Sequence, residues 1–330
     1  MHHIISQPIK VGGNEFNVGA SIGIATYPEV PTVDKLVQSA DMAMYEAKKN
    51  GRHFACFYTK HLENKHRNQR TLEHELEQAL ETNELHAMYQ PIISSKTESG
   101  LNVESLCRWE SHKLGSVSPE KFIPVAEAAL LGDSLGRVML QKGGQLKKLC
   151  EQNNIKLGKL SINVFGRQFV DKEFSDRLLR ELQEFDIPPE LLCIEISEQQ
   201  MIDNLKDCQE QLIKLRRNGI EIALDDFGTG FSSIMHLKQF PVDVIKLDRA
   251  LTANIDRNQD NQALCEGIIH MAHRFNMTVT AEGIERQEEY KVLHEMECDE
   301  FQGYLFGRPM RDSALLDHWQ LDHWQKVGKH

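Results

Sequence analysis

The sequence lacks a long apolar run, and its few cysteines follow no spacing typical of a metal site or a disulfide framework. None of the apolar stretches approaches the roughly 18 residues of a membrane-spanning helix, and no signal peptide opens the chain. The seven cysteines are scattered and include no C-x-x-C pair, which argues against structural zinc and favours free thiols. We therefore expect a chain without a membrane segment in the reducing cytoplasm, although a longer parent protein could be membrane-anchored.

Positive charge is also scarce. The chain holds 38 Lys and Arg against 49 Asp and Glu, which gives a formal net charge of −11. This excess of negative charge argues against nucleic acid polymers and anionic membranes as partners. If the ligand carries phosphate, metal ions or a local basic patch must attract it.

Residues 1–58 predict a unit that is too small to bury a core. A strand is predicted over 18–25, a helix over 33–49 and a second strand over 53–58. Two strands and one helix bury little apolar surface, so this part indicates the end of a domain whose first half is missing. Residues 59–84 predict a connecting helix with one stripe of leucines, which favours packing over a dimer seam.

From residue 85 onward, predicted strands and helices alternate, as in an α/β fold. Eight segments predict strands, over 85–93, 102–109, 159–165, 192–197, 221–225, 242–247, 278–282 and 300–305. Helices are predicted between them, over 119–130, 135–151, 171–185, 208–218, 232–239, 261–275 and 287–296. This pattern predicts a (β/α)8 barrel over residues 85–315. Residues 316–330 contain Leu-Asp-His-Trp-Gln twice in tandem and predict a helical tail without a known role.

One short stretch, 221–231, stands out because a buried strand ends in two adjacent carboxylates, Asp225 and Asp226, before a glycine-rich loop. Neighbouring residues on a strand point to opposite faces, but at a strand end they can converge. Two carboxylates in one cavity are costly unless a cation neutralises them. A solvated turn is the alternative, because Asp-Asp before Gly is also ordinary turn chemistry.

Most of the other predicted strands also carry a polar residue at or near an end. With the aspartate pair, these residues are Glu104, Asn163, Glu195, Asp225, Asp226, Lys246, Glu282 and Gln302. In a barrel, functional groups collect at the face where the strands end, so we expect these side chains to converge. Carboxylate and amide oxygens suit Mg²⁺ or Mn²⁺ better than zinc, which usually recruits His or Cys.

Two parts of the chain resemble known families. Ala20–Ala25, followed by Ala40–Arg52, resembles the C-terminal half of a GGDEF, or diguanylate cyclase, domain. Gly12–Phe16 mimics the signature of that family, but it stands immediately ahead of the Ser-Ile-Gly strand instead of well before it. We therefore interpret Gly12–Phe16 as a turn and expect no cyclase activity.

The second resemblance covers roughly residues 70–315. Its motifs occur in the order Tyr89-Gln-Pro91, Glu104-Ser-Leu-Cys-Arg-Trp109, Ser161-Ile-Asn163, Ile194-Glu-Ile-Ser-Glu198, Asp225-Asp-Phe-Gly-Thr-Gly230, Ile245-Lys-Leu-Asp248, Ala281-Glu-Gly-Ile-Glu285 and Gln302-Gly-Tyr304. Together they are similar to EAL-domain cyclic di-GMP phosphodiesterases, whose fold is a TIM-like barrel. Ser105, where that family usually has Ala, departs from its pattern, as do Phe165 and Phe231.

The resemblance implies a two-metal hydrolysis of cyclic di-GMP to linear pGpG. The implied metal ligands are Glu104, Asn163, Glu195, Asp225, Asp226 and Glu282. Asp225 would bridge the two ions, and Lys246 would hydrogen-bond the attacking water; a salt bridge to Asp248 is the alternative role for Lys246. The ions would be Mg²⁺ or Mn²⁺, and Ca²⁺ is expected to inhibit because it takes longer bonds and more ligands.

The resemblance also implies substrate-binding residues, which are Gln90, Leu106, Arg108, Glu285 and Gln302. Glu198 would anchor the loop after the aspartate pair without being a ligand. A homodimer is implied as well, through Phe231–Gln239 and the helix beginning near Asn261. The alternatives from other functional classes are a non-catalytic cyclic di-GMP receptor and a scaffold that acts through protein contacts.

Overall fold

The computed structural model describes residues 9–12, 14–16, 19–49, 54–95, 100–203, 205–228 and 240–320. By its contacts the chain divides into two compact units, residues 1–75 and 76–330, and the boundary falls within helix α3 (Lys60–Glu81). Helix α3 covers most of the predicted connecting segment. In these described ranges no helix has both the length and the apolar composition to span a membrane.

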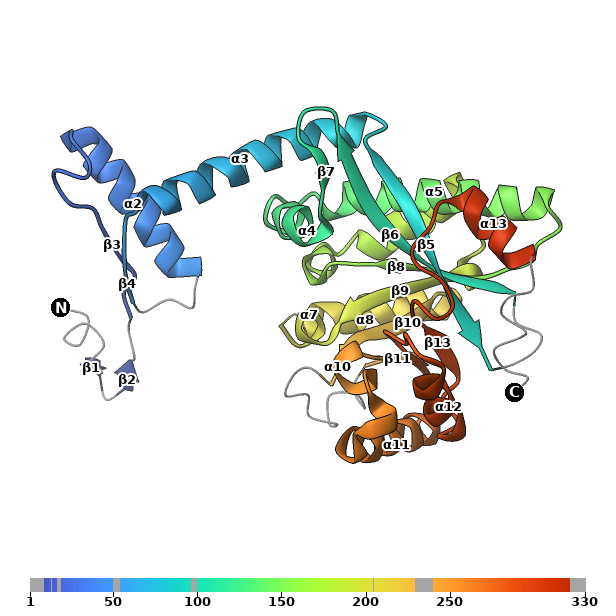
Figure 1. The fold of residues 1–330 in the computed structure, drawn as a ribbon. Helices are drawn as coiled ribbons and strands as arrows, with labels where there is room; N and C mark the ends of the chain where they lie inside the picture. The colour runs from blue at the N-terminus through green and yellow to red at the C-terminus, as the bar shows by residue number, and fades with distance from the viewer. Residues whose placement is uncertain are drawn as a thin grey trace. The chain divides into compact units, whose positions relative to one another are not determined.

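The first unit contains the two strands and the helix that the sequence predicts. Strand β3 (Ile22–Ile24) pairs in parallel with β4 (Ala55–Phe57), and α2 (Val33–Lys49) packs against both (Figure 1). Its buried core is small and consists of Val30, Ala43, Tyr58 and Leu62. Several large apolar side chains remain exposed, among them Val33 and Tyr45. This limited burial is what a fragment of a larger domain should show.

Of the segment Gly12–Phe16, which was predicted as a turn, the described residues belong to a short hairpin. Strand β1 (Ile9–Val11) pairs antiparallel with β2 (Asn14–Phe16). Gly12 at the tip has a φ of 60°, a left-handed conformation that glycine adopts without strain. The prediction was therefore right about the reversal of the chain and missed the strand pairing around it.

The second unit is a barrel of eight strands, which confirms the predicted (β/α)8-type fold (Figure 1). In order around the ring, the strands are β5 (Leu85–Ser94), β13 (Glu300–Gln302), β12 (Thr278–Ala281), β11 (Val244–Leu247), β10 (Glu221–Phe227), β9 (Leu192–Ser197), β8 (Leu157–Asn163) and β6 (Leu101–Ser111). Pairing of β5 with β6 closes the ring. Every predicted strand is present, with ends that differ from the prediction by a few residues.

Strand β5 runs antiparallel to both of its neighbours, β6 and β13, whereas the other pairs in the ring are parallel. Residues 95–100, which join β5 to β6, are too few for the crossover of a dozen or more residues that parallel strands need. The prediction of eight similar strands missed this reversal, although the short link between the first two predicted strands indicates an antiparallel pair. The resulting register places Gln90 directly opposite Glu104.

Helices lie in the connections between the strands. Those that match a predicted helix are α4 (Pro119–Ala128), α5 (Gly132–Gln152), α6 (Phe174–Glu184), α8 (Leu205–Arg217), α11 (Gln259–Arg274) and α12 (Gln287–Glu295). Short elements that the sequence did not predict include β7 (Gly115–Val117), η1 (Gly166–Val170), η2 (Pro189–Leu191), α7 (Glu198–Asp203), α10 (Arg249–Thr252) and η3 (Ile255–Arg257). The predicted helix over 232–239 lies outside the described residues. The tail is helical over α13 (Asp312–Gln320), and residues 321–330 are also outside the described part.

Candidate active site

The polar residues converge because of the alternation of side chains along three neighbouring strands. In β9, β10 and β11, a small apolar cluster separate from the main core is formed by Cys193, Ala223 and Val244. Two positions further along the same three strands come Glu195, Asp225 and Lys246. Since residues two apart on a strand share a face, these three side chains enter the barrel interior beyond the apolar cluster. The site therefore lies toward the carboxyl ends of the parallel strands, as predicted.

Lys246 lies at the centre of the cluster and is only 2% exposed. Its Nζ lies 2.7 Å from Glu195 Oε2 and 2.7 Å from Glu282 Oε1. The same Nζ lies 3.6 Å from Glu104 Oε2 and 3.6 Å from Asp225 Oδ1. The structure thus brings four of the six predicted metal ligands around one ammonium group.

The carboxylates outnumber the positive charge, and two of them, Glu195 and Glu282, have raised pKa values. Burial, together with the nearby Glu104 carboxylate, raises the pKa of Glu195 well above its ordinary value. Burial raises the pKa of Glu282 to about 8. Burial opposes the charge of Lys246 too, but the Asp225 and Glu104 carboxylates hold its pKa well above the ordinary value. The cluster would therefore retain protons at neutral pH unless further cations enter it.

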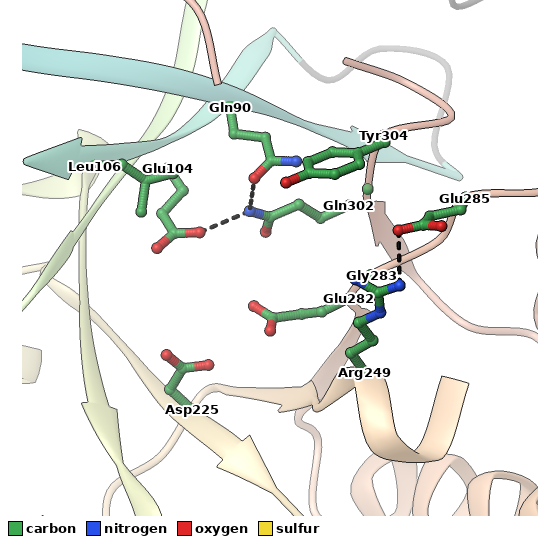
Figure 2. Close-up of a pocket in the computed structure, with 11 residues that line it drawn as sticks. Gln90, Glu104, Leu106, Asp225, Arg249, Glu282, Gly283, Glu285, Gln302 and Tyr304 are labelled. Carbon is green, nitrogen blue, oxygen red and sulfur yellow. Dashed lines mark hydrogen bonds and ion pairs between the residues drawn. The ribbon is translucent and has the colours of Figure 1, made fainter. Parts of the chain in front are cut away.

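Glu104 is fixed by two amide side chains. Gln302 Nε2 donates to Glu104 Oε2 at 2.6 Å, and Asn163 Nδ2 donates to Glu104 Oε1 at 3.0 Å. The same Gln302 amide donates to Gln90 Oε1 at 3.2 Å. Figure 2 shows Gln90, Glu104 and Gln302 facing Glu282 and Asp225 across a cavity. Gln302 Oε1 is buried and accepts no hydrogen bond within the described part of the chain.

The aspartate pair lies in an irregular part of β10. The register between β10 and β11 shifts between Leu224 and Phe227, and Asp226 has a left-handed φ of 56°. Such an irregularity re-aims side chains, and both carboxylates line the same cavity. Burial, then the neighbouring Asp225, raises the pKa of Asp226. Both carboxylates therefore border one cavity, although Asp226 is exposed, and the strand continues to Phe227 instead of ending at Asp225.

Glu198 contacts the chain just after this pair. It is 5% exposed, and its Oε2 accepts a hydrogen bond from the Gly228 N–H at 3.4 Å. Gly228 has a φ of 98°, a conformation that favours glycine, and the Leu251 side chain fills the space where a Cβ would stand. This contact is compatible with the predicted anchoring role. Residues 229–239, including Phe231, lie outside the described part.

Two cavities adjoin the cluster, and both are lined by Leu106 and Asp225. The first, of about 220 Å³, is bordered mainly by polar residues, among them Gln90, Glu285 and Gln302 (Figure 2). The second, of about 340 Å³, combines Arg108 and Asp226 with apolar side chains that include Ile123, Met139 and Phe165. The predicted substrate residues are thus divided between two compartments, and of these residues Leu106 lines both.

Arg249 and Tyr304 line the first cavity but were not predicted as site residues. Arg249 Nη2 lies 2.8 Å from Glu285 Oε1. The Arg308 guanidinium lies 4.1 Å from the ring centre of Tyr304, which is 46% exposed. Arg249 directly follows the motif Ile245–Asp248, and Tyr304 is the last residue of the motif Gln302–Tyr304. Their closeness to these motifs could have identified them as site residues.

The alternative partner of Lys246, Asp248, has a different role. Its side chain accepts a hydrogen bond from the Ala250 N–H at 2.8 Å and caps helix α10. Lys246 is engaged by carboxylates from β6, β9, β10 and the end of β12 instead. The structure therefore favours the predicted central position of Lys246 over a salt bridge to Asp248.

The donor set fits divalent cations, although no ion-binding arrangement is formed as the side chains stand. Among the described residues, no group of three acidic, His or Cys side chains is placed to hold a metal ion, and Lys246 lies between the carboxylates. The available donors are all oxygen atoms and carry more negative charge than one ammonium balances, which suits Mg²⁺ or Mn²⁺. The groups that could hold such ions are Glu104, Asn163, Glu195, Asp225, Asp226 and Glu282.

Comparison with known proteins identifies families for both parts of the chain. The EAL domain family matches residues 73–309, and the diguanylate cyclase GGDEF domain family matches residues 1–53. The bifunctional diguanylate cyclase/cyclic di-GMP phosphodiesterase MucR of Pseudomonas aeruginosa is 32% identical over 94% of this chain and 46% of its own length. The cyclic di-GMP phosphodiesterase NbdA of the same organism is 30% identical over 95% of this chain and 41% of its own length. The chain thus spans less than half of these relatives.

Solved structures agree with this assignment. The PaMucR phosphodiesterase in complex with c-di-GMP has a TM-score of 0.68 and 29% identity, covering 74% of this chain and 99% of its own. The EAL enzyme Bd1971 with cAMP and cyclic di-GMP bound has a TM-score of 0.71 and 28% identity, covering 88% of this chain and 76% of its own. The chain therefore belongs to the EAL domain family, and a fragment of a GGDEF domain precedes its barrel.

Proposed function

We propose that this chain is a metal-dependent phosphodiesterase that hydrolyses cyclic di-GMP to linear pGpG. The observation that carries the proposal is that Lys246 and four oxygen ligands implied by the family meet at one end of the barrel, beside two cavities. The names of the relatives, which include cyclic di-GMP phosphodiesterases, support the same substrate. No cyclase activity is proposed, since residues 1–53 resemble only the C-terminal half of a GGDEF domain.

Two Mg²⁺ or Mn²⁺ ions are the proposed cofactors. Glu104, Asn163 and Glu195 would hold one ion, and Asp226 and Glu282 the other. Asp225 would be shared between them, as the resemblance to the EAL family implies. When bound, such cations act as Lewis acids toward the phosphate and lower the pKa of water. The excess negative charge of the cluster is the physical reason for expecting more than one cation.

The remaining residues would position the phosphates and the nucleophile. Lys246, whose pKa the surrounding carboxylates raise, would bring a positive charge and hydrogen-bond donors to the place where negative charge develops. Arg108, on the second cavity, can donate twice to a phosphate through its planar guanidinium group. Gln90 and Gln302 would present amides, and Glu285 a carboxylate, on the first cavity. Leu106, common to both cavities, would contact the centre of a ligand that extends into each.

The alternative functions are a cyclic di-GMP receptor without turnover and a scaffold. Incubation with cyclic di-GMP and Mg²⁺, followed by chromatography for pGpG, distinguishes them, with an EDTA-treated sample as the control. Release of pGpG that requires Mg²⁺ supports the phosphodiesterase. Thermal stabilisation by cyclic di-GMP without any pGpG would identify a receptor. The absence of both effects would leave the scaffold.

We also propose a cytoplasmic homodimer that assembles through the barrel. Of the two elements implied, the segment 231–239 lies outside the described residues, and helix α11 is described. Helix α11 carries Leu264, which is 54% exposed, on its surface. Sedimentation of the chain over a range of concentrations tests this assembly, and a monomer at all concentrations would contradict it.

A further inference from the structure

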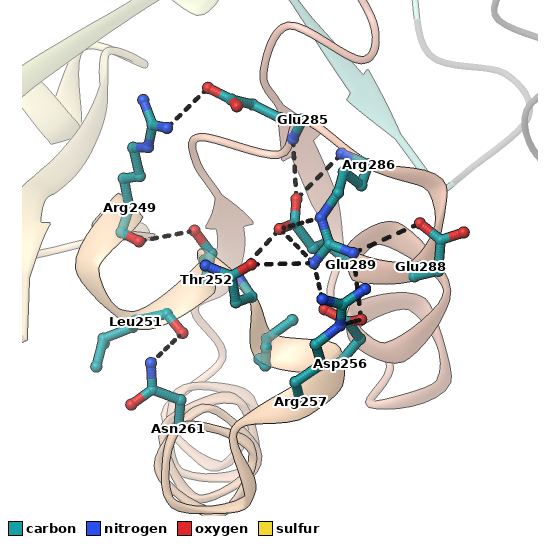
Figure 3. Close-up of polar contacts among 12 residues, drawn as sticks. Arg249, Leu251, Thr252, Asp256, Arg257, Asn261, Glu285, Arg286, Glu288 and Glu289 are labelled. Carbon is teal, nitrogen blue, oxygen red and sulfur yellow. Dashed lines mark hydrogen bonds and ion pairs between the residues drawn. The ribbon is translucent and has the colours of Figure 1, made fainter.

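The loop after β12 carries two site carboxylates, Glu282 and Glu285, three residues apart. Its backbone is bonded on both sides: the Glu282 N–H donates to the Leu247 carbonyl at 3.1 Å, and the Ile284 N–H donates to the Gln302 carbonyl at 3.1 Å. The two accepting carbonyls belong to the ends of the neighbouring strands β11 and β13. Two further side chains, which lie outside both cavities, also form hydrogen bonds with the backbone of this loop (Figure 3).

The first of these side chains is Thr252, at the end of α10, which is 1% exposed. Its Oγ1 donates a hydrogen bond to the backbone carbonyl of Glu282 at 2.5 Å. The Glu282 side chain in turn lies 2.7 Å from Lys246 Nζ. Thr252 therefore holds the backbone of a predicted metal ligand without entering the site.

The second is Glu289, in the first turn of α12, which is 4% exposed. Its Oε2 accepts the N–H groups of Glu285 at 3.0 Å and of Arg286 at 3.1 Å. Its Oε1 accepts the Asn254 N–H at 2.9 Å, and Arg286 Nε and Nη2 at 3.1 and 2.9 Å. Bonding of the Arg286 N–H is half of an ordinary capping box, but the bonds from Glu285 and Asn254 go beyond helix capping.

The surroundings of Glu289 make its charge necessary. Burial by itself would raise the pKa of the Glu289 carboxyl, yet the N–H donors of Asn254, Glu285 and Arg286 hold that pKa below its ordinary value. Asn254 itself has a left-handed φ of 55°, a conformation that non-glycine residues adopt at a cost. A carboxylate with donors on both oxygens has no isosteric neutral substitute, since an amide must turn its NH₂ toward at least one donor.

The same network continues to the cavity wall. Glu285, whose N–H is held by Glu289, reaches Arg249 Nη2 at 2.8 Å, and both residues line the first cavity. Gly283, with a φ of 68°, lies against the Arg249 side chain, where a Cβ would approach its Cγ to 2.6 Å. The loop and α10 are therefore fitted closely together (Figure 3).

We propose that Glu289 and Thr252 are positioning residues with separate effects. Glu289 fixes the backbone at Glu285, a proposed substrate-binding residue, and thereby affects binding of cyclic di-GMP. Thr252 fixes the backbone at Glu282, a proposed metal ligand, and thereby affects binding of the cations. This inference rests on the proposed phosphodiesterase function for the identity of the ligand and the cations.

The test compares Glu289→Gln and Thr252→Val in the full chain. For Glu289→Gln, we expect the KM for cyclic di-GMP to rise roughly tenfold, while the Mg²⁺ concentration for half-maximal activity stays within about twofold of wild type. For Thr252→Val, we expect the opposite pattern, with roughly a tenfold higher Mg²⁺ requirement and a KM within about twofold. Thr252→Ser keeps the hydroxyl and should restore the wild-type Mg²⁺ requirement.

Two controls separate positioning from general loss of structure. Glu288→Gln changes the neighbouring glutamate, whose side chain is 63% exposed, and should leave both quantities unchanged. In a Glu285→Ala background, Glu289→Gln should produce no further rise in KM, because its effect passes through Glu285. If Glu289→Gln fails to fold, Glu289→Asp keeps the charge with a shorter reach and should raise KM in the same direction. The proposal would be overturned if KM and the Mg²⁺ requirement rose equally in both variants. Additive effects on KM in the double variant would also overturn it.

Binding measurements without turnover keep this inference distinct from the proposed function. Calorimetry in the absence of divalent cations measures the affinity for cyclic di-GMP, and electron paramagnetic resonance measures the affinity for Mn²⁺ alone. Glu289→Gln should weaken binding of cyclic di-GMP, and Thr252→Val should weaken binding of Mn²⁺. If the wild-type chain releases no pGpG, the proposed activity fails, while these two binding patterns still support or contradict the positioning roles.

Discussion

Lys246 and Glu195 come from strands that are not neighbours, yet Lys246 Nζ lies 2.7 Å from Glu195 Oε2 inside the barrel. Strand β10 lies between their strands, β11 and β9, in the sheet. The contact is possible because closure of the sheet curves its inner face and brings inward-pointing side chains toward a common centre. One ammonium group can therefore contact carboxylates from several strands at once.

The first prediction concerns this ammonium group. Replacing Lys246 with Met should abolish measurable hydrolysis and destabilise the metal-free protein by about 3–5 kcal/mol, because it leaves buried carboxylates unpaired. Addition of Mg²⁺ should recover part of the lost stability. Denaturant unfolding with and without Mg²⁺ measures both effects. A variant as stable as wild type without metal would show that Lys246 does not balance the cluster.

Asp225→Asn tests the shared ligand. Removal of one negative charge should lower both Mg²⁺ affinity and hydrolysis by at least about 100-fold, since even residues that only support a metal ligand contribute 10–100-fold. The metal-free fold should survive, because one carboxylate fewer relieves repulsion. Turnover within tenfold of wild type would refute the bridging role.

Metal choice is tested by competition. Ca²⁺ takes longer bonds and more ligands than Mg²⁺, so it should bind the oxygen cluster without supporting hydrolysis. Activity in fixed Mg²⁺ should fall as Ca²⁺ is added, and further Mg²⁺ should restore it. Rapid turnover with Ca²⁺ as the only cation would contradict an octahedral site.

A fourth prediction concerns Glu198, whose carboxylate accepts a hydrogen bond from the Gly228 N–H. Glu198→Ala should weaken Mg²⁺ activation roughly 10–100-fold, although Glu198 is not a proposed ligand. If partner contacts also hold this loop, specific activity should fall on dilution through the range in which the dimer dissociates. Unchanged Mg²⁺ dependence together with activity that is independent of concentration would remove the support for this coupling.

The fifth prediction is a dependence of metal-free stability on pH. Glu282 has a pKa raised from 4.5 to about 8 in the folded chain, so between these values the folded state binds more protons than the unfolded state. The contribution of Glu282 to the free energy of unfolding should therefore be most favourable below the lower value and decline as the pH rises toward the upper one. Saturating Mg²⁺ should remove this decline, because bound cations replace the protons. Thermal unfolding at pH 5, 6.5 and 8 in EDTA and in Mg²⁺ provides the measurement, and equal slopes in both would contradict it.

The sequence predicted the barrel and most of the residues around Lys246, because buried strands and polar residues at their ends leave local patterns. It did not reveal that β5 is reversed, although the short link to β6 indicated a hairpin. The left-handed Asp226 and the shifted register beside it could not be foreseen, since a bulge depends on the neighbouring strand. Thr252 and Glu289 were missed for a similar reason. Their roles depend on contacts with Glu282 and Glu285 across the fold, and such contacts leave no periodic signal.

The pairing of β5 with β13 has a consequence for the order of folding. Phe301 pairs with Ile93, so β5 can pair with β6 early, but its other edge stays unpaired until β13 has been synthesised. Pairings between strands adjacent in the chain, from β8 to β12, can form earlier, because they close shorter loops. Gln302 can reach Glu104 and Gln90 only when the ring closes. A chain without β13 therefore holds the acidic strand ends without Gln302, and the wall of the first cavity is complete only once β13 has closed the ring.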